Sequence, residues 1–436
     1  MKKIIALGAL AVLASNTAEA SKARLLALGE NLETAGSLYF SDNRNIFQNA
    51  AFIHEYKDAV YLEWGAQGGQ NAPVFGQLNN KADTDTQPQA EGGFLKSHGK
   101  YVYGLYFGAE SYITHEARSY LRLRNSTKTH QDNQVDAFFG AAESEDFKWG
   151  VNVTYSSTKE DADKAEQQSA SIRLGVMGKK WEGYANVAVL NKSETKAINP
   201  LNTNGKDEFE GKRGWELGGS YDLGFAKAFG YWRHGVWEQD IDSLTATGNT
   251  PADVTGAVYT GKTDFDTNRV RLGLGREAQL NDRTTLFSKV EYVMTKREVK
   301  AKGGSARGSA NIDDYYVPVT IGLEHDATSW LVLRGSVTQY LVSQQDNSYS
   351  SALLASNSPN PPHISPMVTG TYPKGKRSFQ NTTNVNVGAT LKFGDLSIDG
   401  VIGTSTGAGA IGDTKSEKGV LSLDNLASRV AMTYRF

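Results

Sequence analysis

Apolar and polar residues alternate along most of this chain, from about residue 57 to the C-terminus. The clearest segment is NVNVGATLKF, residues 384–393, in which Val385, Leu391 and Phe393 share one face and Asn384, Thr390 and Lys392 share the other. A period of two residues places successive side chains on opposite faces of an extended strand, whereas a helix would repeat about every 3.6 residues. The pattern therefore predicts an all-β protein.

The alternating segments define about sixteen strands, with fourteen as the alternative count. We expect them at residues 57–66, 89–97, 100–110, 133–142, 147–158, 166–177, 181–191, 209–221, 226–237, 263–276, 284–298, 312–325, 329–343, 381–393, 395–403 and 426–436. Of the prolines, only Pro318 falls within a predicted strand. Because proline cannot donate to a strand ladder, Pro318 predicts a bulge or a position at the rim of the sheet.

Three features favour a membrane barrel over a soluble sandwich. The polar face carries charged residues that require water, the apolar face carries aromatic residues near strand ends, and the connections alternate between short and long. The long connections are expected near 67–88, 111–132, 158–166, 192–208, 238–262, 299–311, 344–380 and 404–425. Outer-membrane barrels have this arrangement, with short periplasmic turns and long outer loops. We expect a transmembrane antiparallel β-barrel with a short, partly helical N-terminal segment.

The alternation also assigns side chains to the two faces of the wall. The residues expected to line the pore are Arg173, Arg269, Arg271, Lys289, Glu291, Arg334, Lys392, Asp399 and Arg429. The residues expected in the aromatic girdle are Trp64, Trp149, Trp215, Tyr315, Phe393 and Tyr434. Basic residues predominate on the inner face, and Arg269 and Arg271 would attract anions. In the alternative interpretation, opposite charges pair across the wall and leave the lumen nearly neutral.

The first twenty residues have the features of an export signal. Lys2 and Lys3 precede the apolar stretch 4–14, and Ala18-Glu19-Ala20 is a small-x-small cleavage site. The expected organisation is a signal peptide at 1–20, an N-terminal segment and possible plug at 21–56, and a barrel at 57–436. The formal net charge of −2 gives no reason to expect nucleic acid, and the lack of cysteine excludes disulfides and thiol chemistry.

The last residues, RVAMTYRF, resemble the terminal strand of Gram-negative outer-membrane barrels. In those proteins the barrel-assembly machinery recognises a terminal aromatic residue and a second apolar or aromatic residue two positions earlier. Phe436 and Tyr434 match this assembly signal. The resemblance implies a location in the cell outer membrane. The expected partners are outer-membrane lipid and lipopolysaccharide, the assembly machinery and small solutes, with oligomerisation left open.

Residues 21–66 resemble the start of the FadL-type fatty-acid-channel barrels. In that family an acidic-rich stretch and an Asn-Pro-Ala motif precede the first strand, and the segment plugs the barrel. The corresponding residues here are Asn49-Ala50-Ala51, within SDNRNIFQNAAFIHEYKDAVYLEWG, and the proline of the motif is absent. Before this stretch, ARLLALGENLETA predicts a short amphipathic helix.

Catalytic and metal-binding patterns are weak. No HxxxH or HExxH pattern is present, so zinc is not indicated. The pair Asp313-Asp314 and the histidines His234 and His325 are the remaining candidates for barrel enzymes. The acidic loop around Asp253 lacks calcium-binding spacing. We expect no enzyme activity, no cofactor and no metal.

These observations predict an outer-membrane porin that lets small polar solutes diffuse, because a sixteen-strand barrel generally encloses an aqueous channel. Two alternatives remain. The first is a FadL-like transporter of hydrophobic compounds, plugged by residues 21–56. The second is a non-channel barrel, such as an adhesin or an abundant structural protein, that acts through outer loops 238–262 and 344–380.

Overall fold

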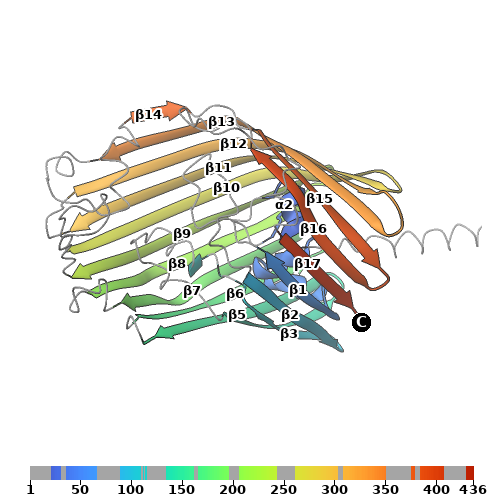
Figure 1. Ribbon diagram of the computed structural model, residues 1–436, viewed down its shortest axis with the longest axis horizontal. Helices are drawn as coiled ribbons and strands as arrows, with labels where there is room; N and C mark the ends of the chain where they lie inside the picture. Colours follow the sequence, from blue (N-terminus) through green and yellow to red (C-terminus); the bar gives the residue numbers. More distant parts are fainter. Residues whose placement is uncertain are drawn as a thin grey trace, which may run out of the picture.

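The protein forms a closed antiparallel β-barrel (Figure 1). The structure, a computed structural model, describes residues 21–30, 36–65, 89–109, 111, 113–114, 134–161, 165–195, 206–242, 261–302, 308–349, 375–378, 383–406 and 429–436. The expected signal peptide and the tips of the long outer loops lie outside these residues. Among the described residues, no helix is long and apolar enough to cross a membrane.

The strands follow one another around the ring in chain order. They are β1 (Ala59–Gly65), β2 (Gln89–His98), β3 (Tyr101–Phe107), β4 (Val135–Ser144), β5 (Phe147–Glu160), β6 (Ala165–Gly178), β7 (Trp181–Thr195), β8 (Lys206–Asp222), β9 (Lys227–Asp242), β10 (Gly261–Asn281), β11 (Thr284–Lys302), β12 (Gly308–Asp326), β13 (Leu331–Tyr349), β14 (Gly375–Ser378), β15 (Thr383–Phe393), β16 (Leu396–Thr406) and β17 (Arg429–Arg435).

The ring has sixteen wall positions, which confirms the predicted fold and strand count. β14 pairs with β13 from Gln344 to Asn347, above the region where β15 pairs with it, so β14 and β15 together fill one position of the 17-stranded sheet. β1 pairs with β17 through Ala59↔Arg435 to Gly65↔Arg429 and closes the ring. Closure removes every unpaired edge, which hydrocarbon could not satisfy.

The outer face of the wall carries apolar side chains. On β5, Val153 is 48% and Tyr155 50% exposed, whereas the intervening Thr154 is 2% exposed. This is the alternation that a barrel in lipid requires. Pro318 lies at a register shift between β12 and β13, which confirms the predicted bulge.

The wall is much taller on one side than on the other. β1, β3 and β17 each have 7 residues, whereas β10 has 21 and its neighbours β11 to β13 have 19. About 9–11 residues suffice for a tilted strand to cross a bilayer. The long strands therefore continue beyond the membrane at the end of the long connections. The predicted outer loops 158–166 and 299–311 were too long, because β5, β6, β11 and β12 extend into them.

The N-terminal segment lies inside the barrel, at the end that carries the short turns and the C-terminus (Figure 1). It contains α2 (Lys22–Ala27), η1 (Asn43–Phe47) and η2 (Ala50–His54). We call the described residues 21–30 and 36–57 the plug. The helix is shorter than ARLLALGENLETA suggested, because Gly29 takes a left-handed conformation with φ of 80° soon after Ala27.

Candidate functional site

The plug rests on a row of glycines in the barrel wall. Gly140, Gly150 and Gly175 face inward on β4, β5 and β6 and are direct cross-strand partners. A Cβ on Gly150 would lie 2.2 Å from the carbonyl oxygen of Ala50, and one on Gly175 would lie 1.9 Å from Oδ1 of Asn49. The backbone of the plug therefore occupies space that any other residue in the wall would fill.

The Asn49-Ala50-Ala51 turn makes this contact. Asn49 caps η2 by accepting the Ala51 N–H at 3.0 Å, and its Nδ2 donates to Glu182 of β7 at 3.2 Å. The motif that resembles Asn-Pro-Ala is thus the part of the plug that touches the glycine row. The missing proline does not prevent the turn, because the Asn49 side chain holds it.

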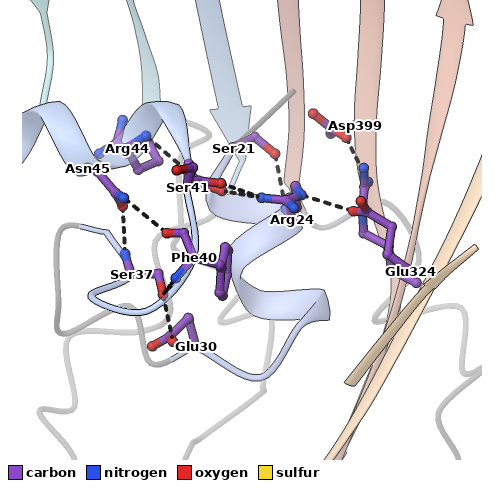
Figure 2. A network of polar contacts seen from close by, with 12 residues as sticks. Ser21, Arg24, Glu30, Ser37, Phe40, Ser41, Arg44, Asn45, Glu324 and Asp399 are labelled. Atoms are coloured by element: carbon purple, nitrogen blue, oxygen red, sulfur yellow. Dashed lines mark hydrogen bonds and ion pairs between the residues drawn. The ribbon is translucent and has the colours of Figure 1, made fainter. Parts of the chain in front are cut away.

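A first ion-pair group, the Arg24 cluster, joins α2 to the wall (Figure 2). Arg24 is 1% exposed and pairs with Asp42 of the plug at 3.2 Å and with Glu324 of β12 at 3.0 Å. Glu324 also contacts Arg334 of β13, which lies 2.9 Å from Asp399 of β16. Burial raises the pKa of Asp42 to about 6, against the opposing charge of Arg24.

A second group, the Glu30 cluster, places a plug carboxylate between two cations of the wall. Oε2 of Glu30 lies 3.2 Å from Arg271 of β10 and 3.0 Å from Lys289 of β11, and Glu291 contacts both cations as well. Burial opposes ionisation of Glu30, but Lys289 and Arg271 outweigh it and lower the pKa of Glu30. Glu30 is therefore an ionised group enclosed by the barrel.

A third group, the Arg44 cluster, lies where the plug meets β1 and β2. Glu63 and Glu91 are direct cross-strand partners, each 6% exposed. Arg44 and Lys22 approach Glu91 at 2.9 and 2.6 Å, and Arg44 lies 3.8 Å from Glu63. The plug thus supplies the cations that keep two buried, adjacent carboxylates from repelling each other.

Apolar side chains fill the space between these clusters. One cluster of buried apolar side chains joins Phe47 and Ile53 of the plug to Tyr61, Leu95 and Phe138 of the wall. A second cluster, next to Glu30, contains Leu25, Leu28, Leu38, Tyr39, Phe40, Tyr184, Phe229, Tyr231 and Phe287. Burying this area is favourable, whereas buried ion pairs alone contribute little net stability. The apolar clusters hold the plug, and the ion pairs fix its position.

A seam interrupts the wall between β7 and β8. Their pairing stops at Val187↔Trp215 and resumes at Lys192↔Glu210, so Ala188–Asn191 and Gly211–Gly214 are unpaired with each other. A register shift occurs within each stretch, at Val189 in the β6–β7 ladder and at Lys212 in the β8–β9 ladder. Bulges of this kind bend a strand and terminate pairing.

Ile113 covers the seam from the inside of the barrel. A Cβ on Gly214 would lie 3.1 Å from Ile113 Cγ2, and Asn191 donates to the carbonyl of Thr114 at 3.1 Å. The cleft at the seam encloses about 50 Å³. That volume is far below the 300–1,000 Å³ typical of ligand pockets, so the seam is closed in this state.

The predicted pore residues whose side chains the structure describes face the interior, but most are already paired. Arg271, Lys289, Glu291, Arg334 and Asp399 belong to the clusters described above. Arg173 is 2% exposed and lies 2.6 Å from Asp136, and Arg269 donates to the Tyr316 hydroxyl at 3.1 Å. Lys392 lies 3.4 Å from Asp326. The Arg429 side chain lies outside the described part of the chain. This arrangement differs from an open pore with free cations.

The predicted girdle residues lie on the outer face. Trp64, Phe393 and Tyr434 are exposed, and Trp149, Trp215 and Tyr315 are half-buried. The sequence analysis missed further exposed aromatic residues at the turn end of the barrel, among them Phe147, Trp181, Phe225 and Trp330. The missed residues lie in or beside the short turns, outside the regular alternation. Phe436 is also exposed, and its N–H donates to the carbonyl of Asp58 at 3.1 Å.

The candidate catalytic residues do not form a site. Asp313 and Asp314 point to opposite faces of β12, where Asp313 accepts from Tyr315 and Asp314 contacts Arg297. His234 contacts Asn268, and His325 contacts Thr284. Asp253 lies outside the described residues, and no metal-binding group of three His, Cys, Asp or Glu occurs within them.

Sequence reasoning did not identify Arg24, Glu30, Arg44, Glu63 or Glu91 as site residues. Glu63 and Glu91 could have been found in the sequence, because each is a carboxylate at a position that the alternation turns inward. For the plug residues no periodic signal exists.

No family model and no curated protein matches this chain. Among solved structures, the CymD monoaromatic hydrocarbon channel has a TM-score of 0.39 and 10% identity, over 94% of this chain and 96% of its own. A Pseudomonas aeruginosa FadL homologue has a TM-score of 0.39 and 12% identity, over 92% and 96%. The Pseudomonas putida toluene transporter TodX has a TM-score of 0.33 and 12% identity, over 96% and 98%.

Proposed function

We propose that this protein is an outer-membrane transporter for apolar compounds that carry a carboxylate, and that transport requires movement of the plug. The observation that carries the proposal is the Glu30 cluster. The wall offers two cations, Arg271 and Lys289, to a single carboxylate that comes from the plug. The apolar cluster that contains Tyr39, Phe229 and Phe287 lies directly beside them.

A ligand with both chemical parts would compete with the plug for this site. Its carboxylate would replace that of Glu30 at Arg271 and Lys289, since charge-assisted hydrogen bonds to a carboxylate are among the strongest in proteins. Its hydrocarbon part would replace plug side chains such as Leu28 and Leu38. Binding would then stabilise the state in which the plug is displaced. The stabilisation equals the difference in ligand binding free energy between the displaced and the seated plug.

The seam offers such a compound a route that avoids the polar lumen. The seam adjoins an outer face on which Val189 is 62% exposed. An apolar molecule that reached the seam would enter the hydrocarbon layer without crossing water. In this proposal Ile113 and the seam control the lateral step, and the plug controls access to the periplasm.

Passive diffusion of polar solutes is the second candidate function. Hydroxyl and amide side chains line the inner wall, for example Asn152, Thr154, Ser169, Thr338 and Asn386. Such a lining suits polar solutes better than hydrocarbons. However, the plug lies across the turn end of the barrel, so this function would also need the plug to leave.

The test compares dodecanoate with dodecanol, which has the same chain length but no charge. We expect refolded protein to bind dodecanoate at least ten times more tightly. Lys289→Met should lower dodecanoate affinity about tenfold, a loss of about 1.4 kcal/mol. It should leave dodecanol binding unchanged. Lys392→Met, which removes a paired lysine far from the Glu30 cluster, is the matched control. Equal affinity for the two ligands would contradict the proposed site.

A further inference from the structure

Asp58 is the junction between the plug and the barrel. It follows the last plug residue, Lys57, and precedes β1. Among the residues that the structure describes, it is the only one other than glycine with a positive φ, at 59°. A non-glycine residue keeps this conformation only when its surroundings hold it there.

The side chain of Asp58 is held by the end of β2. Oδ1 accepts the Ser97 N–H at 3.2 Å, and Oδ2 accepts the Ser97 hydroxyl at 2.7 Å. Lys96 pairs with Oδ1 at 3.1 Å. These contacts tie the C-terminal end of the plug to the neighbouring turn.

The C-terminal residue completes the arrangement. The Phe436 N–H donates to the Asp58 carbonyl at 3.1 Å, and Nζ of Lys96 lies 4.4 Å from the centre of the Phe436 ring. The same lysine therefore contacts both Asp58 and Phe436. We call Asp58, Lys96, Ser97 and Phe436 the clasp. It joins three chain regions that are far apart in sequence.

We propose that the clasp couples closure of the barrel to retention of the plug, so that Phe436 has a structural role in addition to its predicted role as an assembly signal. β17 reaches Asp58 only when it pairs with β1, and that pairing is the step that closes the ring. Before closure the Asp58 carbonyl lacks the Phe436 N–H and Lys96 lacks the ring. The C-terminal end of the plug is then held only by its contacts with β2. Closure supplies both contacts at once.

The test measures how fast trypsin cuts refolded protein after Arg44, which is 2% exposed while the plug is in place. We expect Asp58→Ala, Asp58→Gly and deletion of Phe436 each to raise the cutting rate at least tenfold. Circular dichroism and the gel shift of unheated protein should remain those of a closed barrel. Asp395→Ala is the matched control, because Asp395 accepts the Arg435 N–H through its backbone carbonyl, which alanine retains.

The two Asp58 variants keep the test decisive if the deletion does not fold. Glycine adopts a positive φ freely and lacks the carboxylate, so it separates backbone strain from the side-chain contacts. If Asp58→Gly protects Arg44 as well as the unaltered protein does, the clasp does not retain the plug. The same conclusion follows if Asp395→Ala releases the plug as strongly as Asp58→Ala.

Discussion

The smallest residues in the wall decide where the plug sits. Gly175 is the most confined of the glycine row, since a Cβ there would lie 1.9 Å from Asn49 Oδ1 and 2.6 Å from the Ala51 nitrogen. Both contacts belong to the rigid turn of η2, so the plug must move. We predict that Gly175→Ala leaves the barrel folded and increases amide hydrogen exchange in residues 43–56 at least tenfold.

Gly183→Ala is the control for the effect of alanine on a strand. Gly183 lies on β7, and a Cβ added there would be no closer than 3.8 Å to its nearest neighbour, Cγ2 of Val176. Faster exchange in the plug of this variant too would show that the effect arises from the strand and not from contact with the plug.

Asp42 should make plug stability depend on pH. Its pKa in the folded protein is about 6, above the ordinary 3.8, so the folded state binds the proton more tightly than the unfolded state. Stability from this group therefore rises as pH falls from 7 to 4.5, by about 2 kcal/mol. Below that range Glu30, whose pKa is lowered, begins to lose its own contribution.

The measurement is the free energy of plug opening from hydrogen exchange, corrected for intrinsic rates, at pH 7 and pH 4.5. The unaltered protein is compared with Asp42→Asn, so that contributions from His54 and other groups cancel. Relative to Asp42→Asn, the unaltered protein should have a higher free energy of plug opening at pH 4.5 than at pH 7. A difference that does not change with pH would mean that Asp42 titrates normally.

At the scale of whole elements, the seam between β7 and β8 can be locked. The Cβ of Ala188 and a Cβ built on Gly214 lie 3.1 Å apart, slightly closer than the Cβ atoms of a disulfide, which are about 3.5–4.5 Å apart. The chain contains no cysteine, so Ala188→Cys with Gly214→Cys forms one defined pair. We predict that oxidation stops dodecanoate transfer from solution into liposomes that contain the protein, and that reduction restores it.

A second cysteine pair across an intact ladder is the control. Ala137 and Val153 are direct partners on β4 and β5, so a bridge there adds a disulfide without crossing the seam. Transfer that continues through the oxidised seam variant would place the exit elsewhere.

The strands were predictable because lipid imposes a simple rule on them. Every second residue of a spanning strand must be apolar, and segments such as residues 384–393 follow this rule closely. The rule ends where the wall leaves the membrane. The outward residues Glu238, Lys262 and Lys300 are charged, so the upper parts of β9 to β11 resembled loops. Their ladders continue because backbone pairing needs no apolar side chains.

The plug contacts were not predictable for a different reason. Arg24 and Glu324 are 300 residues apart, and neither residue carries a local pattern that points to the other. Only closure of the barrel brings β12 around to the plug. The glycine row has the same origin, because Gly140, Gly150 and Gly175 align only through the registers of two ladders.

For the whole molecule, the ion pairs predict which ions an unplugged barrel conducts. In the three clusters the wall contributes the cations Arg271, Lys289 and Arg334 and the anions Glu63, Glu91, Glu291, Glu324 and Asp399. Three positive and five negative charges give these wall residues a net charge of −2. The plug contributes Lys22, Arg24 and Arg44 against Glu30 and Asp42, which is +1. The sequence alone suggested an anion preference, because it did not identify Glu63 and Glu91 as inward carboxylates.

We therefore predict that the unaltered protein shows no steady conductance in planar bilayers and that Gly175→Ala conducts with a preference for cations. The preference should strengthen at low salt, since the Debye length grows to about 30 Å at 0.01 M. The measurement is the reversal potential across a tenfold KCl gradient. Steady conductance of the unaltered protein would show that the plug does not seal the barrel. Anion preference in Gly175→Ala would show that the plug, once displaced, still covers the carboxylates of the wall.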